Sequence, residues 1–358
     1  MTASAQFLAR LGIGLPLIQA PMAGTSTPQL AAAVAEAGAL GSIAIGAASA
    51  DQARRMIGDT RGLTARPFNV NVFCHARARR NVAREAAWIA HLAPLFAEAG
   101  AQPPSALDEI YTSFLDDEDS LKVLLETRPA VVSFHFGLPD AARIAALRAA
   151  GIYLMATATN LDEARRIERA GIDAIVAQGI EAGGHRGMFD PAAPDERLSA
   201  AVLTRLLVKR TGIPVVMAGG IMDGQGIRAA LDLGAAAAQL GTAFVACPES
   251  AASAAHRALL GGERAATTRL SAAISGRPAR GIATRLMAHG DAPGSPAPAD
   301  YPVAYDAAKQ LHAAATKAGI HEFGAYWAGQ GAPLARALPA AELVRVLGRE
   351  AGAGSLPG

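Results

Sequence analysis

The chain of 358 residues lacks most features that mark secreted, membrane or nucleic-acid-binding proteins. It has two cysteines, Cys74 and Cys247, which match no metal-ligand spacing and predict buried free thiols. The segment from Met1 to Arg10 lacks the basic and then apolar pattern of a signal peptide. The longest weakly polar run, residues 30–50, is interrupted by a glutamate and predicts a helix followed by a strand rather than a membrane span. We therefore expect a cytoplasmic protein with no membrane segment.

Strong net charge and clustered metal ligands are also absent from the sequence. The formal net charge is +2, and aromatic residues make up only 5%. Short basic clusters such as residues 77–80 have no interleaved aromatics, which is typical of solvated helix faces rather than a nucleic-acid footprint. No spacing of Asp, Glu and His predicts a metal site, and no Gly-x-Gly-x-x-Gly motif follows the first strand. These absences argue against a metalloenzyme and against a Rossmann dinucleotide site.

What the sequence does contain is a repeated alternation of apolar strands and helical segments. Several helical segments end on a glycine, which is typical of a left-handed C-terminal cap. Eight short, continuously apolar strands favour a parallel sheet buried on both faces, and eight is the number in a closed (β/α)8 TIM barrel. A doubly wound open sheet is the alternative. The predicted strands are Leu15–Ala23, Leu40–Gly46, Pro67–Phe73, Ala130–Gly137, Tyr153–Thr159, Ala174–Gly179, Pro214–Gly220 and Ala238–Phe244. The helices predicted between them include Pro28–Gly38, Asp140–Gly151, Leu161–Gly171 and Gly224–Gly234.

Two segments interrupt this alternation and suggest a division into domains. Residues 1–245 are predicted to form the barrel, with a helical insertion at about residues 74–128. Residues 246–358 are predicted to form a small, mainly helical domain that lines or covers the substrate pocket and in part closes back onto the barrel. It includes the predicted helices Ala304–Ala318 and Ala340–Leu347. Peripheral decoration without a part in the site is the alternative. The last eight residues are expected to fray.

The most informative segment is a glycine-rich turn after the sixth strand, Gln178-Gly-Ile-Glu-Ala-Gly-Gly-His-Arg-Gly187. Its adjacent glycines permit close approach of the backbone to a ligand and tolerate positive φ. Its histidine, His185, can act as an acid or base near neutral pH. The segment therefore predicts a backbone cradle with a proton-transfer group at its edge. The alternative is a tight turn whose histidine only caps the chain or faces solvent.

Polar residues at other strand ends indicate the ligand. The segments Ala218-Gly-Gly-Ile221 and Gln239-Leu-Gly-Thr242 have small residues that let backbone amides reach phosphate oxygens. Asn71 and Gln178 carry both donors and acceptors for the edge of a planar heterocycle, and Pro21-Met22 can supply an apolar wall. This combination favours FMN over a simple sugar phosphate.

These segments resemble those of the nitronate monooxygenases (2-nitropropane dioxygenases) of class I, over nearly the whole chain. The barrel segments are shared with related FMN reductases, whereas His185 and the C-terminal segments are more specific. The segments that carry the resemblance are Gln19-Ala-Pro-Met-Ala-Gly24, Asn69-Val-Asn71, His135-Phe-Gly137, Gly179-Ile-Glu-Ala-Gly-Gly-His-Arg-Gly187, Met217-Ala-Gly-Gly-Ile221, Gln239-Leu-Gly-Thr242, Ser275-Gly-Arg-Pro-Ala-Arg-Gly281, Tyr301-Pro-Val-Ala-Tyr305 with Lys309, and Trp327-Ala-Gly-Gln-Gly331.

The resemblance implies a role for each matching residue. His185 would be the catalytic residue near the flavin, either as a base or by orienting a nitronate. Tyr301, Tyr305 and Lys309 would line the substrate pocket, and on a helix they would share one face. His135 would be a second imidazole of the substrate site, with a hydrogen-bonded strand-end histidine as the alternative. The residues implied to hold FMN are Met22, Asn71, Gln178, Gly183, Gly220, Gln239, Leu240, Gly241 and Thr242.

The function that follows is the FMN-dependent oxidation of alkyl nitronates, such as propionate 3-nitronate, by O2 to a carbonyl compound and nitrite. No external reductant is expected, and the partners are the small-molecule nitronate and O2, for a monomer or homodimer. The alternative is an NAD(P)H-dependent FMN reductase of the same barrel superfamily, acting on a quinone or an enoyl thioester. A third hypothesis is a flavin-binding barrel without turnover. We expect Arg277 to have a structural role, and the remaining histidines to be surface or packing residues.

Overall fold

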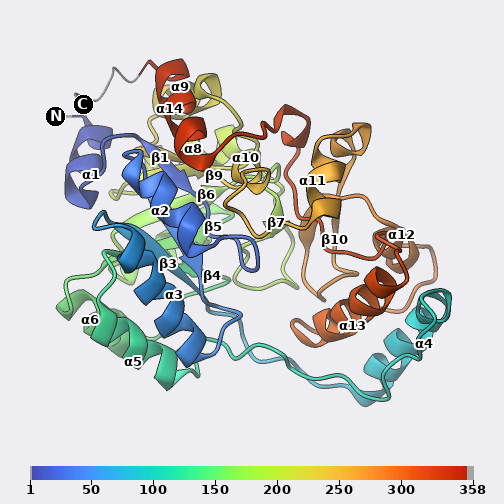
Figure 1. Ribbon diagram of the computed structural model, residues 1–358. Coiled ribbons are helices and arrows are strands. Elements are labelled where there is room, and N and C mark those ends of the chain that lie inside the picture. Colours follow the sequence, from blue (N-terminus) through green and yellow to red (C-terminus); the bar gives the residue numbers. More distant parts are fainter. Residues whose placement is uncertain (1, 353–358) are drawn as a thin grey trace.

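The computed structural model describes residues 2–352 and contains a barrel of eight parallel strands surrounded by helices (Figure 1). The strands follow the order β1-β9-β8-β6-β5-β4-β3-β2, and a parallel bridge between Ile18 and Leu40 closes the ring. The predicted (β/α)8 barrel is therefore confirmed, and the open sheet is wrong. The barrel strands are β1 (Leu17–Gln19), β2 (Gly41–Ala44), β3 (Phe68–Phe73), β4 (Val131–His135), β5 (Tyr153–Ala158), β6 (Ala174–Gln178), β8 (Val215–Ala218) and β9 (Ala237–Leu240).

Most helices around the barrel begin where a short polar side chain accepts a hydrogen bond from a backbone N–H of the first turn. The glycines that follow four of the predicted helices, Gly38, Gly151, Gly171 and Gly234, have positive φ, as expected for left-handed caps. The capped helices, each with its capping residue, are α1 (Ala3–Leu11, Thr2), α2 (Pro28–Glu36, Thr27), α3 (Ala50–Leu63, Ser49), α5 (Glu118–Thr127, Asp117), α6 (Ala141–Ala149, Asp140), α7 (Leu161–Arg169, Asn160), α8 (Ala200–Arg210, Ser199) and α9 (Gly224–Asp232, Asp223).

The predicted strands are longer than the observed ones, and the eighth is wrong at its end. Residues 242–244, predicted as the end of the eighth strand, instead belong to the short helix α10 (Thr242–Val245). Strand β9 stops at Leu240, the residue paired with the last residue of β1, Gln19. The first strand is short because Pro16 and Pro21 flank it and have no N–H to donate to a ladder.

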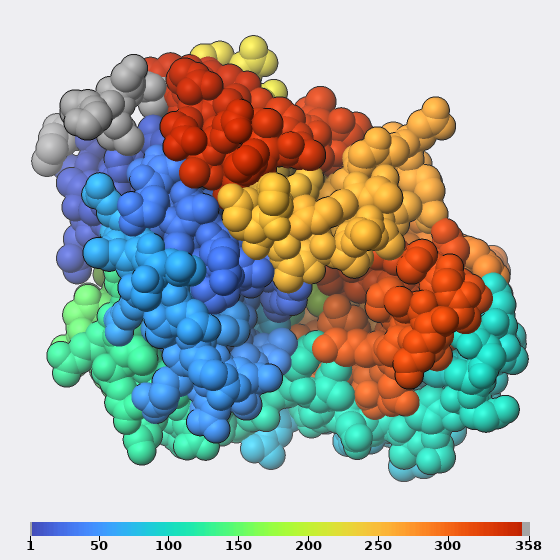
Figure 2. Space-filling model, viewed as in Figure 1, coloured from blue at the N-terminus to red at the C-terminus, as the bar shows by residue number. Residues whose placement is uncertain are grey.

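The insertion after β3 and part of the C-terminal region pack on each other beside the barrel. Helix α4 (Val82–Glu98) lies against α13 (Val303–Lys317), and the two are seen side by side in Figures 1 and 2. Their shared apolar cluster includes Trp88, which is fully buried, and residues of α12 (Arg285–Gly290). The insertion therefore has its own apolar contacts with the C-terminal region.

The C-terminal region also contains strands, which the sequence analysis did not predict. The strands β10 (Thr268–Ser271) and β11 (Ala279–Ile282) form a small antiparallel sheet with β7 (Gly184–His185), the strand that carries the turn histidine. The helix α14 (Ala340–Glu350) returns to the barrel and packs on α2 and α9. The remaining elements are α11 (Ala254–Leu260), η1 (Glu263–Ala266) and η2 (Ala332–Leu334).

The domain division at residue 245 stays a prediction. The predicted fraying of the last eight residues falls largely on residues 353–358, which lie outside the described residues. Across residues 2–352, none of the helices combines the length and the apolar character needed to span a membrane.

We expect Trp88→Ala to lower the free energy of unfolding by about 3–5 kcal/mol, because it leaves a cavity between α4, α12 and α13. Val82→Ala on the same helix is the matched control, since Val82 is 83% exposed and should change stability by no more than about 0.5 kcal/mol. Urea unfolding followed by circular dichroism measures both. A loss below about 1 kcal/mol for Trp88→Ala would contradict the packing described for α4.

Candidate active site

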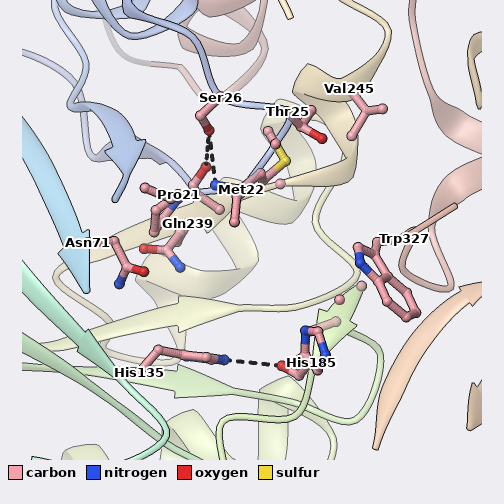
Figure 3. Close-up of a pocket in the computed structure, with 18 of the residues that line it drawn as sticks. Pro21, Met22, Thr25, Ser26, Asn71, His135, His185, Gln239, Val245 and Trp327 are labelled. Atoms are coloured by element: carbon pink, nitrogen blue, oxygen red, sulfur yellow. Dashed lines mark hydrogen bonds between the residues drawn. The ribbon is translucent and has the colours of Figure 1, made fainter. Parts of the chain in front are cut away.

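A cavity of about 820 Å³ opens at the carboxyl ends of the barrel strands. Figure 3 shows residues from opposite sides of the barrel mouth facing into it, with Pro21, Met22 and Gln239 on one side and His135 and His185 on another. All the residues predicted for the site line this one cavity, and their individual roles stay predictions. They are Met22, Asn71, His135, Gln178, Gly183, His185, Gly220, Gln239, Leu240, Gly241, Thr242, Tyr301, Tyr305 and Lys309.

The loop after β1 is held by a buried serine. The hydroxyl of Ser26 accepts hydrogen bonds from the backbone N–H of Met22, at 2.9 Å, and from Nε2 of Gln19, at 3.0 Å. The oxygen Oε1 of Gln19 in turn accepts from the N–H of Ser42 on β2, at 2.8 Å. The side chain that caps α2 is that of Thr27, so the hydroxyl of Ser26 is free to hold the backbone of Met22, a residue of the cavity wall.

A glycine-lined cradle follows β8 and β9. Gly219 and Gly220 have φ values of 120° and 73°, in the region that favours glycine. Among residues 2–352, the amides of Gly219, Gly220, Gly241 and Thr242 donate no hydrogen bond to the protein. Free amides at closely spaced turns are the donors that bind phosphate in many barrels.

The C-terminal loop that contains Trp327 completes this cradle. From the sequence, this loop was identified only as a segment shared with the family. The N–H of Gly329 donates to Oγ1 of Thr242 at 2.9 Å, and Gly331 packs on the carbonyl of Gly220. A Cβ on Gly183 would lie 2.6 Å from the backbone of Ala328, so this part of the turn tolerates no side chain. Loops of the barrel and a loop of the C-terminal region therefore build one wall.

The side chains of Asn71 and Gln178, both predicted to bind the cofactor, differ in which of their atoms remain free to form hydrogen bonds. The Nδ2 group of Asn71 donates to the carbonyl of Ser133 at 3.0 Å and to its hydroxyl at 2.9 Å, so its Oδ1 is the atom left to accept a hydrogen bond in the cavity. The Nε2 group of Gln178 donates to the carbonyl of His185 at 2.9 Å, and its Oε1 accepts from the N–H of Gly187 at 2.8 Å. Gln178 thus holds the turn, a role that the sequence analysis missed.

The two histidines of the site have different hydrogen-bond partners. In His135, Nε2 donates to the carbonyl of His185 at 3.2 Å, and Nδ1 accepts from the hydroxyl of Thr157 at 3.0 Å. Figure 3 shows the first of these contacts. Both ring nitrogens of His135 are therefore bonded within the protein. In His185, Nε2 lies 2.8 Å from the hydroxyl of Ser275, a residue that the sequence analysis placed only in a family segment.

Burial keeps these imidazoles neutral. It lowers the pKa of His185 to about 3, with further contributions from His135 and Arg277, and it lowers the pKa of His135 to about 4. Burial also raises the pKa of Tyr305 to about 12 and that of Tyr301 well above its usual value. At neutral pH the site therefore contains neutral imidazoles and protonated phenols.

An aromatic wall surrounds the ring of His185. The ring centroids of Tyr301, Trp327 and Tyr305 lie 5.3, 5.2 and 6.0 Å from that of His185. The Nζ atom of Lys309 lies 5.5 Å from the ring centroid of Tyr305. Tyr305 and Lys309 lie on α13, whereas Tyr301 precedes this helix, which begins at Val303. The residues converge nevertheless, since Tyr301 enters the wall from the preceding loop.

Two further aromatic residues belong to the site and were missed from the sequence. Tyr111 comes from the insertion, lines the cavity, and has its ring 4.9 Å from Nζ of Lys309. Phe136 also lines the cavity, and its φ of 76° is rare for a residue other than glycine. Tyr111 lies in an irregular segment with no periodic pattern, so no local sequence signal indicated it.

The structure also places residues whose roles were left open. Arg277 is buried, donates to the carbonyl of Met188, and lies 4.2 Å from the ring centroid of Phe136, which agrees with the structural role expected for it. The carboxylate of Glu181 accepts from the N–H of Ala200, at 2.8 and 3.1 Å. Of the remaining histidines, His75 is fully buried and packs on Tyr301, with ring centroids 5.0 Å apart.

Comparison with known proteins identifies similar chains over almost the full length. The family described as nitronate monooxygenase matches residues 5–350. A nitronate monooxygenase of Paraburkholderia phytofirmans is 60% identical over 98% of this chain and 95% of its own length. One of Pseudomonas aeruginosa is 57% identical over 96% of this chain and 98% of its own. The crystal structure of nitroalkane oxidase from Streptomyces ansochromogenes has a TM-score of 0.87 and 43% identity, covering 96% of this chain and 97% of that one.

The neutral buried histidines predict how stability depends on pH. Between the unfolded-state pKa of about 6.5 and folded-state values of about 3 to 4, the unfolded chain binds protons that the folded chain does not. The free energy of unfolding should therefore fall as the pH is lowered from 7 to 5, by up to about 1.4 kcal/mol per pH unit for each such histidine. Urea unfolding at several pH values measures this slope.

The variant His135→Gln should make that slope shallower. The matched control is His321→Gln, since His321 is exposed and its replacement should leave the slope unchanged. A stability that does not change between pH 7 and pH 5 would contradict neutral burial of these side chains.

Proposed function

We propose that this chain, which belongs to the nitronate monooxygenase family, oxidises alkyl nitronates with O2 to a carbonyl compound and nitrite and needs no external reductant. The observation in the site that supports this best is that a neutral imidazole, two protonated phenols and a lysine line the same cavity as a glycine cradle with free amides. A cavity of this size, with few polar groups at defined positions, is suited to a cofactor together with a small substrate.

FMN is the cofactor that the donors and acceptors of the cavity fit. The free amides of Gly219, Gly220 and Gly241 would bind its phosphate, and Oδ1 of Asn71 would accept from a ring N–H. Met22, whose loop Ser26 fixes, would contact the ring. Bound FMN supplies the redox chemistry between the substrate and O2. The protein supplies binding, orientation and the exclusion of water.

The state of His185 bears on which form of the substrate is used. A nitronate has already lost the acidic proton next to its nitro group, whereas a neutral nitro compound needs a base to remove it. An imidazole with a pKa of about 3 is a weak base. The site therefore favours a substrate that arrives as the nitronate, and His185 orients it. Removal of the proton from a neutral nitro compound would be a secondary use of the same side chain.

The aromatic wall provides groups for the charge of the substrate. The hydroxyls of Tyr301 and Tyr305 stay protonated and so can donate hydrogen bonds to an anion. Lys309 makes no ion pair within residues 2–352, so its charge is available at the edge of the cavity. A nitronate with a second anionic group, such as propionate 3-nitronate, matches this arrangement. The monomeric or homodimeric state and the cytoplasmic location stay predictions.

We expect Gly220→Ala to reduce flavin binding at least tenfold, because an alanine is strained at a φ of 73° and its Cβ would lie 3.3 Å from Cβ of Glu181. Gly151→Ala is the matched control. Gly151 has a φ of 80° with open space around the added Cβ, so it carries the same backbone strain far from the cradle. Flavin absorbance after dialysis measures retention. Equal flavin content in both variants would contradict the position of the phosphate cradle.

The purified protein should consume O2 and release nitrite from propionate 3-nitronate in the absence of NAD(P)H. The variant His185→Asn should keep its flavin but lose turnover by about 10²-fold, because the imidazole that orients the nitronate is lost and misplaced reacting groups cost a rate factor of that order. An oxygen electrode and a colorimetric nitrite assay measure both.

Three other results would each reject part of this proposal. No uptake of O2, with rapid bleaching of the flavin by anaerobic NADH or NADPH, would assign the chain to the reductase alternative. A flavin inert to nitronates and to nicotinamides would indicate a binding protein without turnover. Unchanged turnover in His185→Asn would show that His185 is not the residue that acts on the substrate.

A further inference from the structure

A buried serine contacts the ring of His185 from the C-terminal region. Its hydroxyl lies 2.8 Å from Nε2 of His185, and Ser275 has no exposed surface. Within residues 2–352 this is the one hydrogen bond of the His185 ring, because Nδ1 has no protein partner. His185 lines the cavity, and its Nδ1 is not a buried atom that lacks a partner, so this nitrogen is accessible from the cavity. The two nitrogens of the ring are therefore distinguished by Ser275.

The other contacts of the serine hydroxyl indicate which ring nitrogen of His185 carries the proton. The hydroxyl donates its single hydrogen to the carbonyl of Arg277 at 3.1 Å and accepts from the N–H of the same residue at 3.3 Å. Because that hydrogen is used, the contact with His185 is a hydrogen bond only if Nε2 is the donor. All three contacts are satisfied together in one arrangement, with the proton of the neutral imidazole on Nε2.

The turn that carries Ser275 has little freedom to move. A Cβ on Gly276, whose φ is 85°, would lie 2.1 Å from the carbonyl oxygen of Ala299, so this turn is pressed against the segment that leads into Tyr301. On its other side, the N–H of Arg186 donates to the carbonyl of Pro278 at 2.8 Å, and β11 pairs with β7 directly beside His185. The serine and the histidine are therefore held by the same small sheet.

We infer that Ser275 is a positioning residue that fixes His185 as the Nε2–H tautomer and leaves the lone pair of Nδ1 open to the substrate cavity. The tautomer of His185 concerns the protein alone, whereas its effect on the orientation of the substrate rests on the proposed function. The lone pair of Nδ1 repels the two charged oxygens of a nitronate. It therefore directs the carbon of the nitronate toward His185 and the oxygens toward the hydroxyls of Tyr301 and Tyr305.

The test is to read the tautomer of His185 directly in the flavin-bound protein. Two-bond proton–nitrogen correlation spectra of protein labelled with ¹⁵N-histidine distinguish Nδ1–H from Nε2–H, and the His185→Asn variant assigns the signals among the eight histidines. The wild type should show protonated Nε2 and unprotonated Nδ1. In Ser275→Ala we expect mixed tautomers and a kcat for propionate 3-nitronate at least tenfold lower, with a smaller change in KM and an unchanged flavin content.

Two further variants separate positioning from a general effect on folding. Ser275→Thr keeps the hydroxyl and should restore the wild-type tautomer and most of the turnover. Ser271→Ala removes another buried hydroxyl of the same small sheet, which bonds the carboxylate of Asp291 at 2.9 Å. This variant should change neither the tautomer of His185 nor the turnover.

A wild-type spectrum with Nδ1–H overturns the inference, and so does a Ser275→Ala variant with wild-type tautomer and kcat. If Ser275→Ala does not fold, the wild-type and Ser275→Thr spectra still decide. If the wild type shows the Nε2–H tautomer but does not oxidise nitronates, the proposed function fails while the role of Ser275 stands.

Discussion

The geometry of the site depends on the hydrogen bonds by which the end of β6 holds the turn that follows it. The side chain of Gln178 bridges that turn, since it donates to the carbonyl of His185 and accepts from the N–H of Gly187. Arg186, almost fully buried, donates to the carbonyl of Gln178 at 2.8 Å and forms a two-bond ion pair with Asp195. A buried guanidinium is tolerated only when it is paired in this way. The histidine therefore projects from a turn whose backbone is bonded on both sides.

The turn would still be incomplete without chain segments that are distant in sequence. The strand β11 pairs with the short strand that bears His185, and Ser275, on the turn before it, bonds the imidazole. The loop from Trp327 to Gly331 packs on the turn and on the glycine cradle, while Tyr301 is part of the aromatic wall. The barrel thus provides the strand ends, and the region after it provides most of the groups around the imidazole.

Much of this arrangement was predictable because it is local. Apolar runs and glycine caps identify all eight barrel strands, and all the residues predicted for the site line the cavity. What was not predictable depends on long-range pairing. The end of β9 at Leu240 is set by where its neighbour β1 stops, and the use of the Gln178 amide by the protein itself depends on how the turn folds back. Ser275 contacts His185 across 90 positions of sequence, a distance at which no spacing rule operates.

Burial of the active-site imidazoles has two consequences that oppose each other. It removes the stabilisation that water gives to a charged ring, so the folded protein gives up stability in acid to keep these rings neutral. In return, the ring that faces the cavity adds no positive charge that could pair with an anionic substrate in an unreactive position. Under the proposed function, the charge of a nitronate would then be met elsewhere, by protonated phenols and by Lys309 at the cavity edge. Because these groups lie on one wall, we expect them to favour a single orientation of the anion.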